Sequence, residues 1–139
     1  MAYQIQKRPH VREEVTITDD GRELTVNVDI DVHQIMTRYN GAVQKIREAE
    51  DEIKKLREGE GLNPDNIGEA YAALGRAIMN LFNLLFGEEQ TNRIVEFYQG
   101  SAPEMLADFV PFLQDVVTPK IRDAQLQISR RYASKPWAK

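Results

Sequence analysis

The residues that most often do chemistry in proteins are few in this chain and badly spaced for it. His10 and His33 are the only histidines, and no carboxylate stands at ligand spacing from either beyond the nearby Asp31. A metal ion needs three or four converging ligands, and general acid–base catalysis needs a positioned partner group. We therefore expect neither a metal site nor a catalytic histidine.

Other reactive groups are also better explained as structural. Residues 59–61 (Gly-Glu-Gly) lack the spacing, the Lys and the preceding strand of a phosphate-binding loop. Ser101 has no nucleophile-elbow context and suits a helix cap. Four acidic side chains lie among lysines and arginines on a helix face that we expect to be solvated: Glu48, Glu50, Asp51 and Glu52. We expect no enzymatic activity and no cofactor.

Length and composition indicate one soluble domain. The chain has 139 residues, an apolar fraction of 42%, a charged fraction of 29%, no cysteine and a mean hydropathy of −0.51. No apolar run approaches the roughly 18 residues needed to cross a bilayer, and the polar start does not resemble a signal peptide. We expect a flexible segment at 1–12, a single domain at 13–133, a flexible tail at 134–139, and a cytoplasmic location.

Charge is distributed unevenly along the chain. The net charge is −4, with the acidic side chains concentrated in residues 13–119, whereas residues 120–139 are basic apart from Asp123. A basic tail could contact nucleic acid or an acidic partner, but cations also suit the end of a solvated helix. Since the acidic body would repel a phosphate backbone, we do not expect nucleic-acid binding.

Alternation of apolar and polar residues predicts a β-hairpin at 13–30. Val15 and Ile17 alternate with threonines, and a second alternating run follows at 24–30. Between them residues 19–22 (Asp-Asp-Gly-Arg) have the composition of a tight turn. A lone hairpin is marginally stable in water. Its apolar face must therefore lie on the helices or pair with another chain.

The clearest periodic feature is a heptad stripe that predicts a helix at about 32–58, with Asp31 as its cap. The stripe consists of Val32, Ile35, Tyr39, Ala42, Ile46, Ala49, Ile53 and Leu56. Met36 and Val43 broaden its first half, which we expect to lie on the core beside the hairpin. The narrow second half, from Ile46 to Leu56, is expected to project and to close on the next helix or on another copy of the chain.

Further helices follow, so the predicted fold is mainly α with an N-terminal β-hairpin (α+β). A second helix from Pro64 to Phe86 pairs with the first in a long helical hairpin, and its last stretch is apolar nearly all round. Shorter C-terminal helices come next. Ser101 and Glu104 form a capping-box pattern, Pro111 predicts a kink, and residues 118–119 (Thr-Pro) offer a second helix start.

Seven apolar residues are candidates for contact with a partner protein. Three come from the narrow part of the stripe and four are aromatic residues of the later helices: Ile46, Ile53, Leu56, Phe97, Tyr98, Phe109 and Phe112. Aromatic residues at helical spacing usually belong to a core. A few of them could nevertheless line a groove for a partner helix.

With the hairpin and the long helix in view, the run at 85–98 (LFGEEQTNRIVEFY) resembles a tail assembly chaperone of long-tailed bacteriophages and their prophages. The stretches at 104–106, 110–113 and 118–121 are similar to the same family. The resemblance covers about residues 13–130. Its motifs are successions of apolar, Gly and Pro positions rather than a catalytic signature.

The resemblance implies a non-enzymatic protein that binds the phage tape measure protein and keeps it soluble in the host bacterial cytoplasm while tail tube protein polymerises around it. The family brings no catalytic residues to transfer. An alternative is a structural tail or neck subunit that stays in the virion and uses the hairpin and helices for self-assembly. Homo-oligomers are compatible with both hypotheses.

Overall fold

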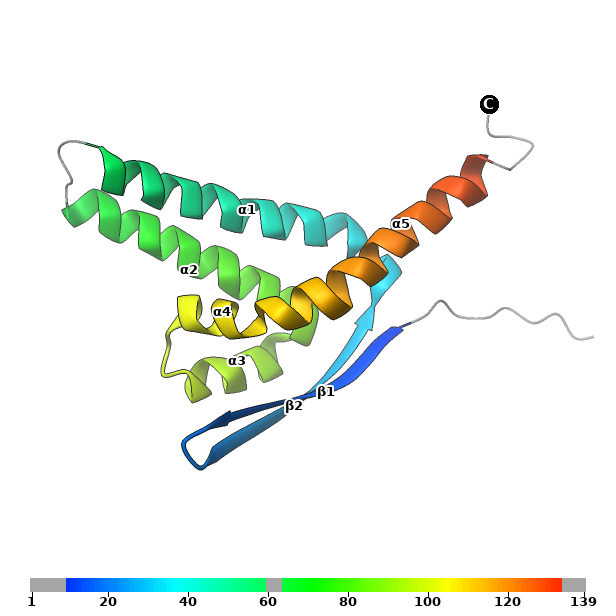
Figure 1. Cartoon of the computed structure of the whole chain (residues 1–139), viewed down its shortest axis with the longest axis horizontal. Helices are drawn as coiled ribbons and strands as arrows, with labels where there is room; N and C mark the ends of the chain where they lie inside the picture. Colours follow the sequence, from blue (N-terminus) through cyan, green and yellow to red (C-terminus); the bar gives the residue numbers. More distant parts are fainter. Residues whose placement is uncertain (1–9, 60–63, 134–139) are drawn as a thin grey trace, which may run out of the picture.

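A computed structural model describes residues 10–59 and 64–133, which form a helical structure preceded by an antiparallel β-hairpin (Figure 1). The expected mainly α architecture with an N-terminal hairpin is confirmed. Residues 1–9, 60–63 and 134–139 lie outside the described residues, and with them lie most of the expected flexible ends and of the connector after the first helix. None of the described helices is long and apolar enough to cross a membrane.

The hairpin is formed by β1 (His10–Asp19) and β2 (Arg22–Asp31). Asp20 and Gly21 both have positive φ, 46° and 85°, as a two-residue type I′ turn requires. The strand begins at His10, three residues earlier than the alternating pattern predicts. Val11, which the sequence placed in a flexible segment, is 1% exposed and pairs with Ile30.

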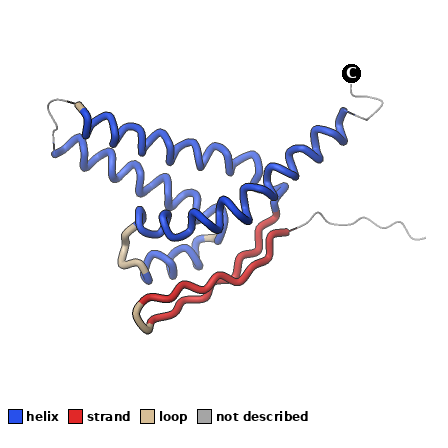
Figure 2. Tube along the Cα trace, in the orientation of Figure 1, coloured by secondary structure: helices blue, strands red, loops and turns tan. Residues whose placement is uncertain are grey.

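The first two helices form the expected antiparallel hairpin (Figures 1 and 2). Asp31 caps α1 (Val32–Glu58) because its carboxylate accepts hydrogen bonds from the N–H groups of His33 and Gln34 at 3.1 and 3.3 Å. The heptad stripe of α1 packs against α2 (Pro64–Phe86), so the narrow seam closes within the chain.

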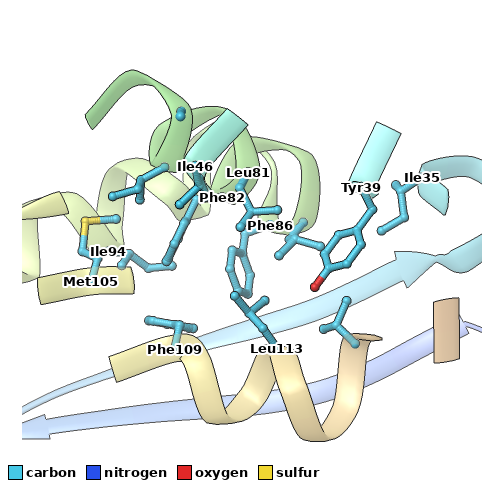
Figure 3. Packing of buried hydrophobic residues seen from close by; sticks show 14 of the residues in the cluster. Ile35, Tyr39, Ile46, Leu81, Phe82, Phe86, Ile94, Met105, Phe109 and Leu113 are labelled. Atoms are coloured by element: carbon cyan, nitrogen blue, oxygen red, sulfur yellow. The ribbon is translucent and has the colours of Figure 1, made fainter. Parts of the chain in front are cut away.

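The C-terminal half of α2 is the centre of the core (Figure 3). Ile78, Leu81 and Phe82 are 0–1% exposed. The Phe82 ring lies 5.1 Å from that of Phe109 and 5.5 Å from that of Phe86 in tilted or edge-to-face geometry. Such aromatic pairs add roughly 0.5–1.5 kcal/mol each to the burial of their area.

The next helix, α3 (Glu88–Phe97), follows directly after Gly87, and a turn with positive φ at Gln99 and Gly100 leads to α4 (Ala102–Phe112). The capping box predicted at Ser101 is wrong, because the Ser101 side chain makes no capping bond. Pro103 is the second helical residue and has no N–H, which removes one of the two groups that such a cap could bind. The Ser101 carbonyl instead accepts the Met105 N–H at 3.1 Å.

The predicted kinked C-terminal helices are confirmed, and a helix begins at Thr118 as predicted, although it continues from the preceding helix without a break (Figure 2). A π-helical turn, η1 (Leu113–Val117), joins α4 to α5 (Thr118–Ala133), and the Thr118 N–H donates to the Leu113 carbonyl five residues back. Pro119 cannot donate to a carbonyl of the preceding turn. A widened turn after Pro111 and before Pro119 accommodates this irregularity without ending the helix.

Side chains of α3 bind the outer edge of β2 and fix the hairpin to the helices. The Gln90 side chain accepts the Asn27 N–H at 2.8 Å and donates to the Asn27 carbonyl at 2.5 Å. Arg93 donates to the Thr25 carbonyl at 3.3 Å. Gln90 thus satisfies both outward groups of Asn27 as a neighbouring strand would.

Replacing Gln90 tests this attachment. Gln90→Ala should lower the free energy of unfolding by about 1–2 kcal/mol, because two hydrogen bonds to the strand edge are lost and solvent replaces them in part. Urea denaturation measures the change. Gln127→Ala, at an exposed position of α5, is the matched control and should stay within about 0.5 kcal/mol of the native value. Equal losses in the two variants would contradict the role of Gln90.

Candidate functional site

An open groove lies between α1 and the α4–η1 segment, and we name it the α1–α4 groove. It measures about 230 Å³. Its lining is mostly apolar and consists of Tyr39, Val43, Ile46, Arg47, Glu50, Leu81, Leu106, Val110, Leu113, Gln114 and Thr118. A groove of this size takes a few apolar side chains of a partner rather than a whole helix.

Helical spacing places these side chains in two facing rows. On α1, Val43, Ile46 and Glu50 follow one another at intervals of three and four residues, so they lie on one face. Leu106 and Val110 lie four apart on α4 and are half-buried. The groove therefore has two apolar walls that solvent still reaches, above a floor formed by Leu81, which is 1% exposed.

The π-helical turn closes one end of the groove. Leu113 and Gln114 lie three and four residues after Val110, so helical spacing places them on the side of the groove. Next to it the Tyr39 hydroxyl and the Thr118 hydroxyl lie 2.8 Å apart and share a hydrogen bond. Since Tyr39 is 3% exposed, this bond joins α1 to the start of α5 in a buried environment. π-Helical turns inside α-helices occur frequently at functional sites.

A second hollow, polar and about 270 Å³ in volume, lies between the tip of the hairpin and the α3–α4 turn. The Arg22 guanidinium lies 2.8 Å from the Asp19 carboxylate and 4.7 Å from the centre of the Phe97 ring. Across the hollow the Tyr98 hydroxyl donates to Asp108 at 2.8 Å. These contacts connect the hairpin tip to α3 and α4.

Tyr98 is the titratable group most affected by its surroundings. Burial raises the pKa of Tyr98 far above its usual range, and the hydrogen bond to Asp108 raises it further. The hydroxyl is thus held as a protonated donor and cannot serve as a base near neutral pH. In the described part of the chain, no group of three or more His, Cys, Asp or Glu residues could hold a metal ion.

The structure separates the seven candidate partner residues rather than gathering them. Ile53 and Leu56 lie at the far end of the α1–α2 hairpin, and Ile46 lines the α1–α4 groove. The four aromatic residues lie nearer the β-hairpin. Phe97 and Tyr98 line the polar hollow, and Phe109 is 2% exposed. Phe112 is half-buried, and its ring stacks on that of Phe86 with the ring centres 6.4 Å apart. No single surface includes all seven.

Sequence reasoning missed Leu106, Val110 and Gln114 as groove residues. Leu106 and Val110 repeat at a spacing of four, but Met105 and Phe109 form a more deeply buried pair one position away and point to the core. A second, weaker apolar row beside the core stripe was the available signal. Gln114 continues the same spacing, four residues after Val110, but as a polar residue it does not extend an apolar row.

Comparison with known proteins adds no relative: no family model matches the chain, nor does any curated protein or solved structure. The groove and the hollow are therefore interpreted from their own geometry.

The raised pKa of Tyr98 predicts a pH-dependent stability. An unfolded tyrosine ionises near pH 10, whereas folded Tyr98 keeps its proton to higher pH. Its stabilising contribution is therefore complete below about pH 10 and is lost as the pH rises through the folded pKa. The native unfolding free energy should fall faster as the pH rises above about 10 than that of Tyr98→Phe, which has no ionisable hydroxyl.

Urea denaturation across this pH range measures both curves. For Asp108→Asn, the unfolding free energy should fall with pH about as steeply as for the native protein. Burial, the larger cause of the raised pKa of Tyr98, remains in this variant. Parallel curves for the native protein and Tyr98→Phe would rule out the coupling.

Proposed function

We propose that this chain is a non-enzymatic assembly chaperone of a long-tailed bacteriophage or prophage, which binds the tape measure protein in the host bacterial cytoplasm and keeps it soluble while the tail tube forms. The observation that carries the proposal is the α1–α4 groove, an open apolar groove between helices. The resemblance of residues 85–98 and the later stretches to such chaperones supplies the identity of the client.

The shape of the groove supports a helical client. A tape measure protein is expected to be a long helical rod with apolar stripes, and exposed stripes of that kind aggregate unless covered. An amphipathic helix presents anchors at intervals of three and four residues. The facing rows Val43–Ile46 and Leu106–Val110 offer a slot for such anchors.

The rim of the groove adds polar selectivity. Arg47 and Glu50 stand on α1 and Gln114 stands on the opposite wall. Rim charges influence the orientation and rate of association more than its strength. Because the rim carries both signs, it favours a client helix whose flanks are themselves of mixed charge.

A structural subunit retained in the virion is the second candidate, and the outer edge of β1 favours it because a neighbour's sheet could extend there. Mass spectrometry of purified particles separates the two candidates. A permanent subunit would be present in many copies, whereas a chaperone would be absent.

Co-expression with the tape measure protein encoded in the same gene cluster tests the proposal. Solubility of the client should rise with the native chain and fall back with Val110→Glu, because a carboxylate in the apolar groove must be desolvated when a helix binds. Ala107→Glu, which adds the same charge at an exposed position of α4, is the matched control and should protect the client as the native chain does.

Thermal unfolding of both variants is the control for folding. Both should unfold cooperatively like the native chain, so that a loss of client solubility with Val110→Glu is not caused by misfolding. Client solubility that is the same with and without the native chain would refute the chaperone proposal. Equal protection by Val110→Glu and Ala107→Glu would refute the assignment of the groove.

A further inference from the structure

The two edges of the β-hairpin are treated differently by the rest of the fold. Asp19 and Arg22 close a two-residue turn and form a hydrogen-bonded pair, so the bonded pairs of the ladder continue at every second residue from there. Odd-numbered residues of β1 bond to even-numbered residues of β2. The N–H and C=O groups of the remaining residues therefore point away from the ladder, at the two outer edges.

In the middle of the β2 edge three of these groups are occupied. Gln90 binds both backbone groups of Asn27, and Arg93 binds the carbonyl of Thr25. At the edge of β1 the outward groups belong to Arg12, Glu14, Thr16 and Thr18. Within residues 10–59 and 64–133, no hydrogen bond reaches these backbone groups. Side chains of α3 thus block the middle of the β2 edge, whereas the β1 edge remains available for a strand.

The apolar face of β1 is also incompletely covered. Val15 and Ile17 are only partly buried, whereas Val26 and Val28, on the same face of β2, are 0% and 2% exposed. A hollow of about 270 Å³ lies beside β1 and is lined by residues 15–18, Tyr98, Asp108, Phe109 and Phe112. A strand added to β1 would bring its inward side chains to this hollow.

We propose that the strand added to β1 is the β1 strand of a second copy of this chain, paired antiparallel about a two-fold axis. The charges of the edge favour this occupant. Arg12 and Glu14 lie two residues apart on the polar face and are both exposed. Pairing centred on Glu13 sets Arg12 against Glu14 of the partner subunit, and the symmetry repeats this opposite-charge contact.

The same register matches the apolar face. Val11 lies opposite Val15 of the partner subunit, and the symmetry repeats this contact. A two-fold axis perpendicular to the sheet keeps the apolar faces of the two hairpins on the same side, so each still faces its own helices. The result is a four-stranded sheet in the order β2-β1-β1-β2, whose two outer edges are the ones that Gln90 already closes. Glu13 meets its symmetry copy on the axis, the one unfavourable contact of this register.

This inference does not depend on the client proposal, because it concerns only copies of this chain. Light scattering over a range of concentrations should show a dimer of the full chain that dissociates on dilution. Glu14→Arg should weaken the dimer about tenfold or more, since it replaces two attractive contacts with two repulsive ones. The double variant Arg12→Glu/Glu14→Arg should restore most of the dimer, since it recovers the contacts across the axis and loses only the contact of Arg12 with Asp29 on β2. Glu13→Gln should strengthen the dimer.

The absence of cysteine allows a direct test of the register. In the proposed register Glu13 and Glu13 of the partner subunit form a non-hydrogen-bonded pair. The Cα atoms of such an antiparallel pair lie about 4.5 Å apart, within disulfide range. Glu13→Cys should therefore give a disulfide-linked dimer under mild oxidation. Glu23→Cys, exposed on β2, is the matched control and should remain mostly monomeric.

Three results would overturn the proposal: a monomer at all concentrations, a dimer that Glu14→Arg leaves intact, or equal crosslinking of the Glu13→Cys and Glu23→Cys variants. A monomer whose Glu14→Arg variant loses only client binding would instead identify the client as the occupant of the edge.

Discussion

The structure depends on enclosing the C-terminal half of α2, which is apolar apart from the exposed Asn80 and Asn83. Ile78, Leu81 and Phe82 are almost fully buried, and Leu85 and Phe86 are 3% and 7% exposed. One neighbouring helix can cover only one stripe of such a segment. α1, α3, α4 and β2 each contact α2 and together enclose it. The short turns at Gly87 and Gln99–Gly100 are the connections that let the chain return to the same segment.

This requirement also explains why the hairpin is asymmetric. β2 lies against α2 and is fixed to α3 by Gln90, so its apolar residues are fully buried. β1 lies beside β2 and away from α2, so its Val15 and Ile17 stay partly exposed. The outer strand is thus stabilised mainly by its ladder with β2, and its own outer edge is the part of the fold with unused hydrogen-bonding capacity.

The sequence predicted the parts of the fold that follow from local periodicity. The hairpin turn, the cap at Asp31, the heptad stripe and the start of α2 at Pro64 all follow from residue types at fixed spacing.

Features that arise from contacts distant in sequence were missed. Gln90 gave no hint that it would bind Asn27, and the strand extends to His10 because Val11 reaches the core. The prolines predicted a kink at Pro111 and a helix start at Thr118, but not the π-helical turn between them, in which Leu113 and Val117 pack on the core. In the candidate site, the sequence predicted Ile46 on the α1 wall of the groove. The opposite wall, on α4, could not be predicted, because it depends on how α4 packs beside α1.

One helix serves both proposed binding surfaces. Leu106 and Val110 of α4 form a wall of the α1–α4 groove, while Asp108, Phe109 and Phe112 line the hollow beside β1. A client anchor that shifts α4 therefore changes the surface on which a second β1 strand would rest. Linkage requires that if the client changes the dimer dissociation constant by some factor, dimerisation changes client affinity by the same factor. We expect that factor to be about five or more, the lower end for coupled sites. Dimer dissociation measured with and without a client helix tests this, and identical constants would show that α4 does not move.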